Sequence, residues 1–176
     1  MVKTKVEESI NQQIQAEFFS FYLYLSMSSY FKNLHLDGFA HWFYIQAQEE
    51  LIHALKLVNF LNERGGRVRL LPLDGPQVDW PSPADAVAAA LEHEQYISSR
   101  INDLLDLATK EKDHATAVLM HWYVNEQVEE EATAETLLHQ VKTLAKSPEG
   151  LIMLDRELAT RPAPVAGPQG GGQASA

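Results

Sequence analysis

Apolar residues recur every three or four positions along most of the chain, which is the repeat of amphipathic α-helices. Turn and capping signals divide this repeat into five segments. The pattern predicts four long helices, at residues 4–33, 38–64, 83–110 and 114–146, and a short fifth helix at 148–160. Because no segment reads as a convincing strand, the predicted fold class is all-α.

Capping signals mark the predicted helix starts. They are Thr4 with Glu7, Asp37, Ser82 followed by Pro83, Asp113, and Ser147 followed by Pro148. The turns near 34–37 and 111–113 are short, so the helices that flank each turn are antiparallel. The connection 65–82 is long enough, when extended, to run the length of the bundle. The sequence therefore predicts a four-helix bundle with one long crossover connection and a short C-terminal helix.

A carboxylate interrupts the apolar stripe of each long helix near its midpoint. The four residues are Glu17, Glu50, Glu94 and Glu130. On the fourth helix we expect the inward stripe to run Leu119, Trp122, Glu126, Glu130, Thr133, Leu137 and Leu144. Helix midpoints lie at one level of a bundle, so we expect the four carboxylates to meet in the core. Like charges that close require either protonation or cations between them.

The position of one histidine favours bound cations over protonation as the way to neutralise the four carboxylates. His53 follows Glu50 by three positions, so the two side chains project from one helix face. A lone core histidine is more often a hydrogen-bonded structural residue, and an interior glutamate more often one half of an ion pair. Here, however, the stripes contain few Lys or Arg residues. Oxygen ligands with one nitrogen suit iron or manganese better than copper or structural zinc.

The two halves of the bundle repeat this pattern. A shift of 77 positions takes Glu17 to Glu94, Glu50 to Gln127 and His53 to Glu130. Two such halves would build a two-metal site, which is the arrangement of ferritin-like carboxylate bundles.

Four segments resemble the non-haem ferritins of bacteria and archaea. They are 11–17 (NQQIQAE), 48–54 (QEELIHA), 92–94 (EHE) and 122–131 (WYVNEQVEEE). The resemblance covers about residues 4–160 and implies a ferroxidase centre. It implies that Glu17, Glu50 and His53 hold one iron, that Glu50, Glu94 and Glu130 hold a second, and that Gln127 lies beside the second. A third iron site is implied at Glu49, Glu126, Glu129 and Glu130.

The resemblance also gives Tyr24 a place near the centre. Its hydroxyl would hydrogen-bond a ligand carboxylate or supply an electron, and core packing is an equal alternative. Bacterioferritins differ from this chain in two ways. They carry a second Glu-x-x-His motif, where this chain has Gln127 and Glu130, and a haem-binding methionine where this chain has Leu51. We therefore expect no haem.

The function implied is iron storage and detoxification. A ferroxidase would oxidise Fe(II) to Fe(III) with O2 or peroxide, and the product would mineralise as ferric oxyhydroxide inside a homo-oligomeric cage of 24 subunits. The fifth helix would pack around the four-fold axes. Two alternatives remain: a di-iron peroxidase of the rubrerythrin type, and a non-enzymatic structural bundle with protonated core acids.

Composition narrows the possible partners and cellular location. The 176 residues carry a net charge of −10, which argues against a nucleic-acid partner. There is no cysteine, so disulfides, thiolate metal sites and a rubredoxin-type iron site are excluded. The most apolar stretch is too short to span a membrane, and we expect a soluble, cytoplasmic protein. We divide the chain into a domain at 1–160 and a disordered tail, rich in Pro, Gly and Ala, at 161–176.

Overall fold

Five helices build the computed structural model, which describes residues 2–144 and 146–164. They are α1 (Thr4–Asn33), α2 (Asp37–Glu63), α3 (Pro83–Lys110), α4 (His114–Leu144) and α5 (Pro148–Leu158). The described residues contain no strand, which confirms the predicted fold class. Each helix starts within one residue of its predicted start, whereas α4 and α5 end two residues early.

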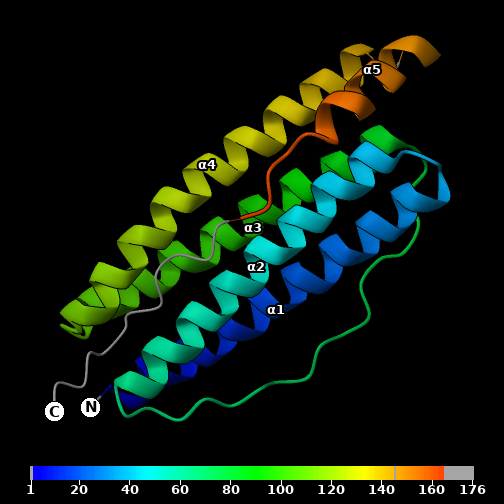
Figure 1. Cartoon of the computed structure of the whole chain (residues 1–176). Coiled ribbons are helices and arrows are strands. Elements are labelled where there is room, and N and C mark those ends of the chain that lie inside the picture. The colour runs from blue at the N-terminus through cyan, green and yellow to red at the C-terminus, as the bar shows by residue number, and fades with distance from the viewer. Residues whose placement is uncertain (1, 145, 165–176) are drawn as a thin grey trace, which may run out of the picture.

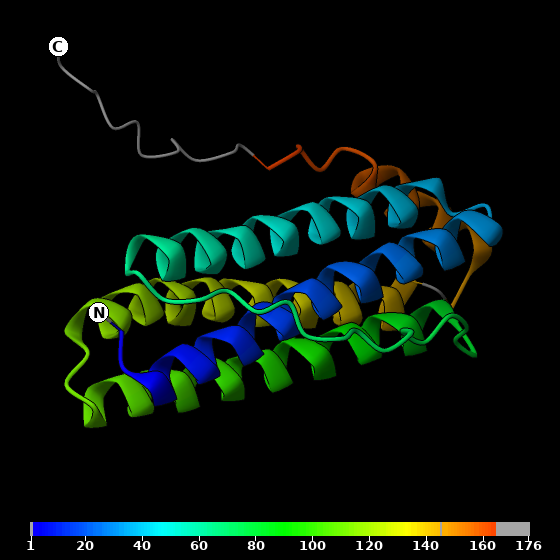
Figure 2. The ribbon, with the colours of Figure 1, turned by 90° about the horizontal axis from the view of Figure 1, so that it is seen from below.

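The helices pack as two antiparallel pairs, α1 with α2 and α3 with α4 (Figure 1). The connection between α2 and α3 runs the length of the bundle alongside α1 (Figure 2). Hydrogen bonds fix its path: Ser26 Oγ donates to Gln77 O at 2.7 Å, and Tyr30 OH donates to Trp80 O at 3.0 Å. The long crossover is therefore confirmed, and α2 and α3 run in the same direction.

Three of the predicted helix caps form. Ser82 Oγ accepts from the amide of Asp85, Asp113 Oδ1 from that of Thr116, and Ser147 Oγ from that of Gly150. The caps predicted at Thr4 and Asp37 are wrong. Both residues are already the first residue of their helix, and neither α1 nor α2 has a side-chain cap at its own N-cap position.

The start of α2 is capped from a distance, by α5. Asp155 Oδ1 accepts from the amide of Gly38 at 2.8 Å and from that of Phe39 at 3.0 Å. A carboxylate at a helix N-terminus satisfies free amides and complements the helix dipole. The approach requires glycine, because a Cβ at position 38 would lie 1.6 Å from Asp155 O. α5 is thereby fixed to the bundle at one defined position.

Buried polar side chains divide the apolar core into two clusters. One cluster holds Phe31, Phe39 and Phe43, with the Phe31 ring centroid 4.9 Å from that of Phe39 and 5.2 Å from that of Phe43. The other is built around Ile10, Leu57, Ile97 and Ile101. Both clusters draw on α1, α2, α3 and α4, so the polar layer between them lies at the middle of the bundle, the level predicted from the helix midpoints.

The stripe predicted for α4 is displaced by about one position. Its buried residues are Thr116, Met120, Tyr123, Gln127, Ala134, Leu137 and Val141. Trp122, Glu126, Glu130 and Thr133 instead line a pocket between α2 and α4. These two helices are not in direct backbone contact, so α4 presents a second, largely acidic face to the pocket beside the core. No described helix is long and apolar enough to span a membrane.

Candidate metal centre

Three side chains from α1 and α2 converge in the middle of the bundle. Glu17, Glu50 and His53 each present a ligand atom, and these atoms all lie within 4.8 Å of one another. The side chains are buried, with exposed fractions of 1%, 2% and 5%. They occupy one level because Glu50 and His53 share a face of α2 that packs on the Glu17 face of α1. The structure therefore brings together three of the predicted ligands.

Each of these three side chains has a buried polar atom without a hydrogen-bond partner among the described residues. The atoms are Glu17 Oε2, Glu50 Oε1 and His53 Nδ1. Their environment is otherwise well paired, since Gln13 Nε2 donates to the other oxygen of Glu17 at 2.8 Å. Buried polar atoms are rarely left unpaired, and two carboxylate oxygens with one imidazole nitrogen suit a hard or borderline divalent cation. The residues present fit a metal ion.

Two further carboxylates complete the polar layer from α3 and α4. Glu94 accepts hydrogen bonds from Tyr24 OH and, at 3.1 Å, from Gln127 Nε2. Glu130 accepts from Gln46 Nε2 at 2.5 Å. The hydroxyl of Tyr24 and the amide of Gln127 thus hold the same carboxylate from opposite helices. Both contact Glu94, one of the carboxylates that the resemblance gives to the second iron.

The carboxylates perturb one another strongly. Burial, followed by repulsion from Glu94, Glu17 and Glu130, raises the pKa of Glu50 well above its usual range. Burial and the charge of Glu94 raise the pKa of Glu130 to about 8. Burial also raises the pKa of Glu94, although Tyr24 and Gln127 oppose the shift. Without a cation these raised pKa values favour the protonated carboxyls, and a metal ion would compete with those protons.

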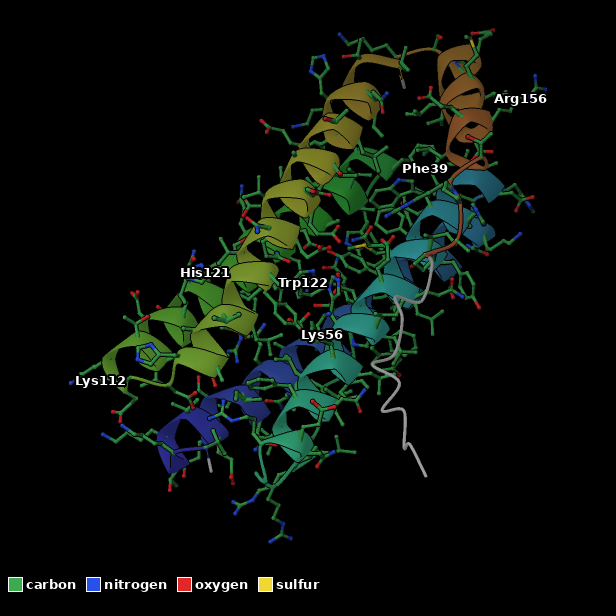
Figure 3. The ribbon with its side chains drawn as sticks, turned by 60° about the vertical axis from the view of Figure 1, so that its left-hand side comes forward. Phe39, Lys56, Lys112, His121, Trp122 and Arg156 are labelled. Carbon is green, nitrogen blue, oxygen red and sulfur yellow. The ribbon has the colours of Figure 1, made fainter. Side chains whose placement is uncertain are left out.

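An open pocket of about 470 Å³ leads to this cluster between α2 and α4. Four acids line it: Glu49, Glu126, Glu129 and Glu130, the set predicted for the third site. His53 and Glu130 belong to both the pocket and the buried cluster, so the two are continuous. Trp122 forms one wall. Its ring meets His53 edge-on at a centroid distance of 5.4 Å and carries Lys56 Nζ at 4.0 Å from a ring centroid (Figure 3).

Arg161 is the residue of this region that sequence reasoning missed. The sequence pattern places it in a disordered tail, but residues 161–164 are described and Arg161 contacts α2. The rest of the predicted tail, 165–176, lies outside the described residues. Arg161 Nη2 donates to Glu49 Oε2 at 2.5 Å, and Nη1 donates to Gln46 Oε1 at 2.9 Å. Burial raises the pKa of Glu49, and the Arg161 charge opposes that rise.

Comparison with known proteins agrees with this geometry. Residues 7–144 match the family described as the Ferritin-like domain. The bacterial non-heme ferritin of Bacteroides fragilis (strain 638R) is 38% identical over 161 residues, which cover 92% of this chain and 100% of that protein. The bacterial non-heme ferritin of Staphylococcus aureus (strain MRSA252) is 32% identical, with 92% and 97% covered.

Solved structures of similar sequence have the same fold. An engineered closed form of the Archaeoglobus fulgidus ferritin superposes with a TM-score of 0.92 at 43% identity, covering 93% of this chain and 100% of that chain. The open-pore ferritin from the same archaeon gives a TM-score of 0.90 at 44% identity, covering 92% and 100%. The family match spans most of the chain, and these relatives share 32–44% identity along nearly their whole length. The chain belongs to the ferritin family.

Proposed function

We propose that this ferritin is an iron-storage ferroxidase, which oxidises Fe(II) at a di-iron centre with O2 or peroxide and stores the product as ferric oxyhydroxide. The observation that carries the proposal is the set of three unpartnered ligand atoms, on Glu17, Glu50 and His53, that converge in the buried core. Iron is here the substrate, and the protein supplies its ligands and their electrostatics.

We assign each side chain a role in holding the iron pair. Glu17, Glu50 and His53 bind the first iron, and Glu50, Glu94 and Glu130 bind the second, with Glu50 between the two. Gln127 and Tyr24 donate hydrogen bonds to Glu94, which orients that carboxylate toward the second iron. Hydrogen bonds of this kind fix the geometry of metal ligands.

The anionic ligand set favours oxidation. Each Fe(II) gives up one electron, and the two electrons of a pair, together with two protons, reduce O2 to hydrogen peroxide. Four carboxylates and one imidazole stabilise Fe(III) more than Fe(II) because the extra positive charge lies in a buried, negatively charged site. Leu51, and not a methionine, directly follows Glu50, and the centre is proposed to work without haem.

The pocket acids would receive iron that leaves the centre. Glu49, Glu126, Glu129 and Glu130 surround space that is continuous with the cluster, so a third iron there lies on the way to the storage cavity. Assembly supplies that cavity. We propose a cytoplasmic cage of 24 subunits, with α5 packed against copies of itself, since Ile152 and Met153 leave 51% and 70% of their surface exposed in the single chain.

Stopped-flow oxidation of Fe(II) in air tests the centre. The substitutions Glu17→Ala, Glu50→Ala and His53→Ala should each slow the first phase of oxidation by about 10- to 100-fold, while the protein stays assembled. His121→Ala is the matched control, because His121 is an exposed imidazole on α4 (Figure 3). Normal initial rates in all three variants would overturn the assignment. Oxidation without retained iron would instead favour a di-iron peroxidase.

A further inference from the structure

The guanidinium of Arg161 lies at the mouth of the metal centre, against its acids. Besides its hydrogen bonds to Glu49 and Gln46, Nη1 lies 3.4 Å from Trp42 O, and the guanidinium carbon lies 4.5 Å from the Trp42 ring centroid. The backbone is held as well, because His41 Nε2 lies 2.9 Å from Arg161 O. Arg161 is therefore fixed by contacts at both its side chain and its main chain.

One oxygen of Glu49 is occupied by this contact. Arg161 Nη2 and Glu49 Oε2 are 2.5 Å apart, and each side chain is only about one-fifth to one-quarter exposed. Hydrogen bonds between charged groups are among the stronger polar contacts in proteins. A metal ion that uses both oxygens of Glu49 competes with the guanidinium for Oε2, and the repulsion between the two cations favours displacement of Arg161.

The same guanidinium orients a second carboxylate indirectly. Because Gln46 Oε1 accepts from Arg161, the amide nitrogen of Gln46 points the other way, and it donates to Glu130 at 2.5 Å. Glu130 belongs both to the pocket and to the buried cluster. Arg161 thus contacts one pocket acid directly and positions another through one amide.

We propose that Arg161 is a resident counter-cation that a metal ion must displace at the third site, so that it keeps this site weak and lets iron pass toward the interior. The inference rests on the proposed function, because it takes Glu49 and Glu130 as ligands in transit. Arg161 is a positioning and affinity-setting residue, and it is not itself a ligand. Its effect should be strongest on the pocket site and weakest on the buried pair.

A second cation in the same pocket provides a control for the proposed displacement of Arg161. Lys56 is a second cation on its wall, but its ammonium lies over the Trp122 ring and forms no ion pair with a described acid (Figure 3). Removing Lys56 takes the same charge from the same pocket without freeing Glu49. Arg156, exposed on α5 (Figure 3), provides a second control outside the pocket.

Terbium(III) luminescence in the assembled, iron-free protein tests the proposal without relying on turnover. Terbium prefers oxygen ligands, and Trp122, which lines the pocket, can sensitise its emission, as can Trp42, which contacts Arg161. The pocket class of sites is identified as the one lost in Glu129→Gln. We expect Arg161→Gln to tighten that class about tenfold, Lys56→Gln about twofold, and Arg156→Gln not at all.

The outcomes separate the inference from the proposed function. If Arg161→Gln matches Lys56→Gln, or leaves the affinity unchanged, the displacement idea is overturned while the third site stands. If no Glu129-dependent class exists in any variant, the third site itself fails, and the inference fails with it. Fe(II) oxidation gives a second readout: Arg161→Gln should keep the first rapid phase but recover it more slowly on a second addition of iron.

Discussion

At the scale of single residues, folding and metal binding make opposite demands on the polar layer. Glu17, Glu50 and Glu94 are at least 97% inaccessible to solvent, and a buried carboxylate without a cation is costly to the folded state. The chain lowers this cost only partly, through donors such as Gln13, Tyr24 and Gln127. The remaining repulsion is available to drive cation binding.

This opposition predicts a pH dependence of stability in the metal-free protein. The pKa values of Glu50, Glu94 and Glu130 are raised on folding, to about 8 for Glu130. The folded state therefore binds more protons than the unfolded state above the ordinary glutamate pKa, and its stability falls as the pH rises from about 5 to about 8. The thermal midpoint measured with a chelator present should drop by at least a few degrees over that range.

The control for this prediction replaces the titrating group. In Glu130→Gln the amide cannot ionise, so the fall in the thermal midpoint should be smaller. Saturating Zn(II) should also flatten it, because a bound cation substitutes for the protons. A midpoint that rises between pH 5 and 8 in the metal-free protein would contradict the raised pKa values.

Tyr24 permits a sharper test at one atom. Its hydroxyl donates to Glu94, so Tyr24→Phe removes a hydrogen bond to a proposed ligand and should weaken binding of the second ion about tenfold. Tyr123→Phe is matched to it, because that hydroxyl is equally buried but donates to the backbone oxygen of His53 at 2.7 Å. Calorimetric titration with Zn(II) measures both. Equal losses in the two variants would show that Tyr24 only packs the core.

Sequence reasoning locates part of this site and misses part for physical reasons. Glu17, Glu50 and Glu94 interrupt apolar stripes at helix midpoints, so periodicity alone places them in one layer. Arg161 has no such signal. It follows the last helix in a segment without periodicity, and only the path of the chain back along α2 brings it to Glu49.

At the scale of helices, a cap that lies next to its helix in the sequence can be predicted, whereas a cap supplied by a distant segment cannot. Ser82, Asp113 and Ser147 cap their own helices, and each was predicted because a cap acts within three residues. The cap of α2 comes from Asp155, more than one hundred residues away. Proximity in the sequence favoured Asp37, which instead pairs with Lys32 at 2.7 Å on the surface.

Replacing each of these two acids with alanine tests which one caps the N-terminus of α2. Asp155→Ala removes an acceptor from two amides at the α2 N-terminus, so we expect a loss of about 1–2 kcal/mol of stability. The thermal midpoint should fall by several degrees. Asp37→Ala removes an exposed acid and should change the midpoint by less than about one degree. A larger effect from Asp37 would contradict the capping assignment.

The displaced stripe on α4 shows the limit of periodicity on a helix with two inward-facing rows, one in the core and one on the pocket. Tyr123 and Gln127 face the closed core, whereas Trp122 and Glu126 face the pocket. Both rows satisfy the helical repeat, so the pattern could not choose between them. The choice is made by the separation of α2 from α4, which opens the pocket that the proposed third site requires.

At the scale of the whole molecule, the bundle follows from the sequence but its assembly does not. Two short turns and one long crossover fix the relative directions of the four long helices. The sequence contains no comparable signal for an interface between subunits, because each interface patch looks like an ordinary surface in a single chain. The strongest indication in the described residues is α5, where Ile152 and Met153 are exposed on a helix that Asp155 fixes to α2.

The C-terminal region should therefore separate assembly from the control of metal affinity. Ile152→Glu combined with Met153→Glu places charges where copies of α5 are proposed to meet. Because burying unpaired charges is costly, the double variant should dissociate, and light scattering should detect smaller species.

A chain that ends at residue 160 keeps α5 and should remain assembled. It lacks Arg161, however, so its pocket should bind terbium as tightly as that of Arg161→Gln. If the shortened chain dissociates, the tail is part of the interface. If it assembles but binds terbium like the full-length chain, Arg161 does not set the affinity of the third site.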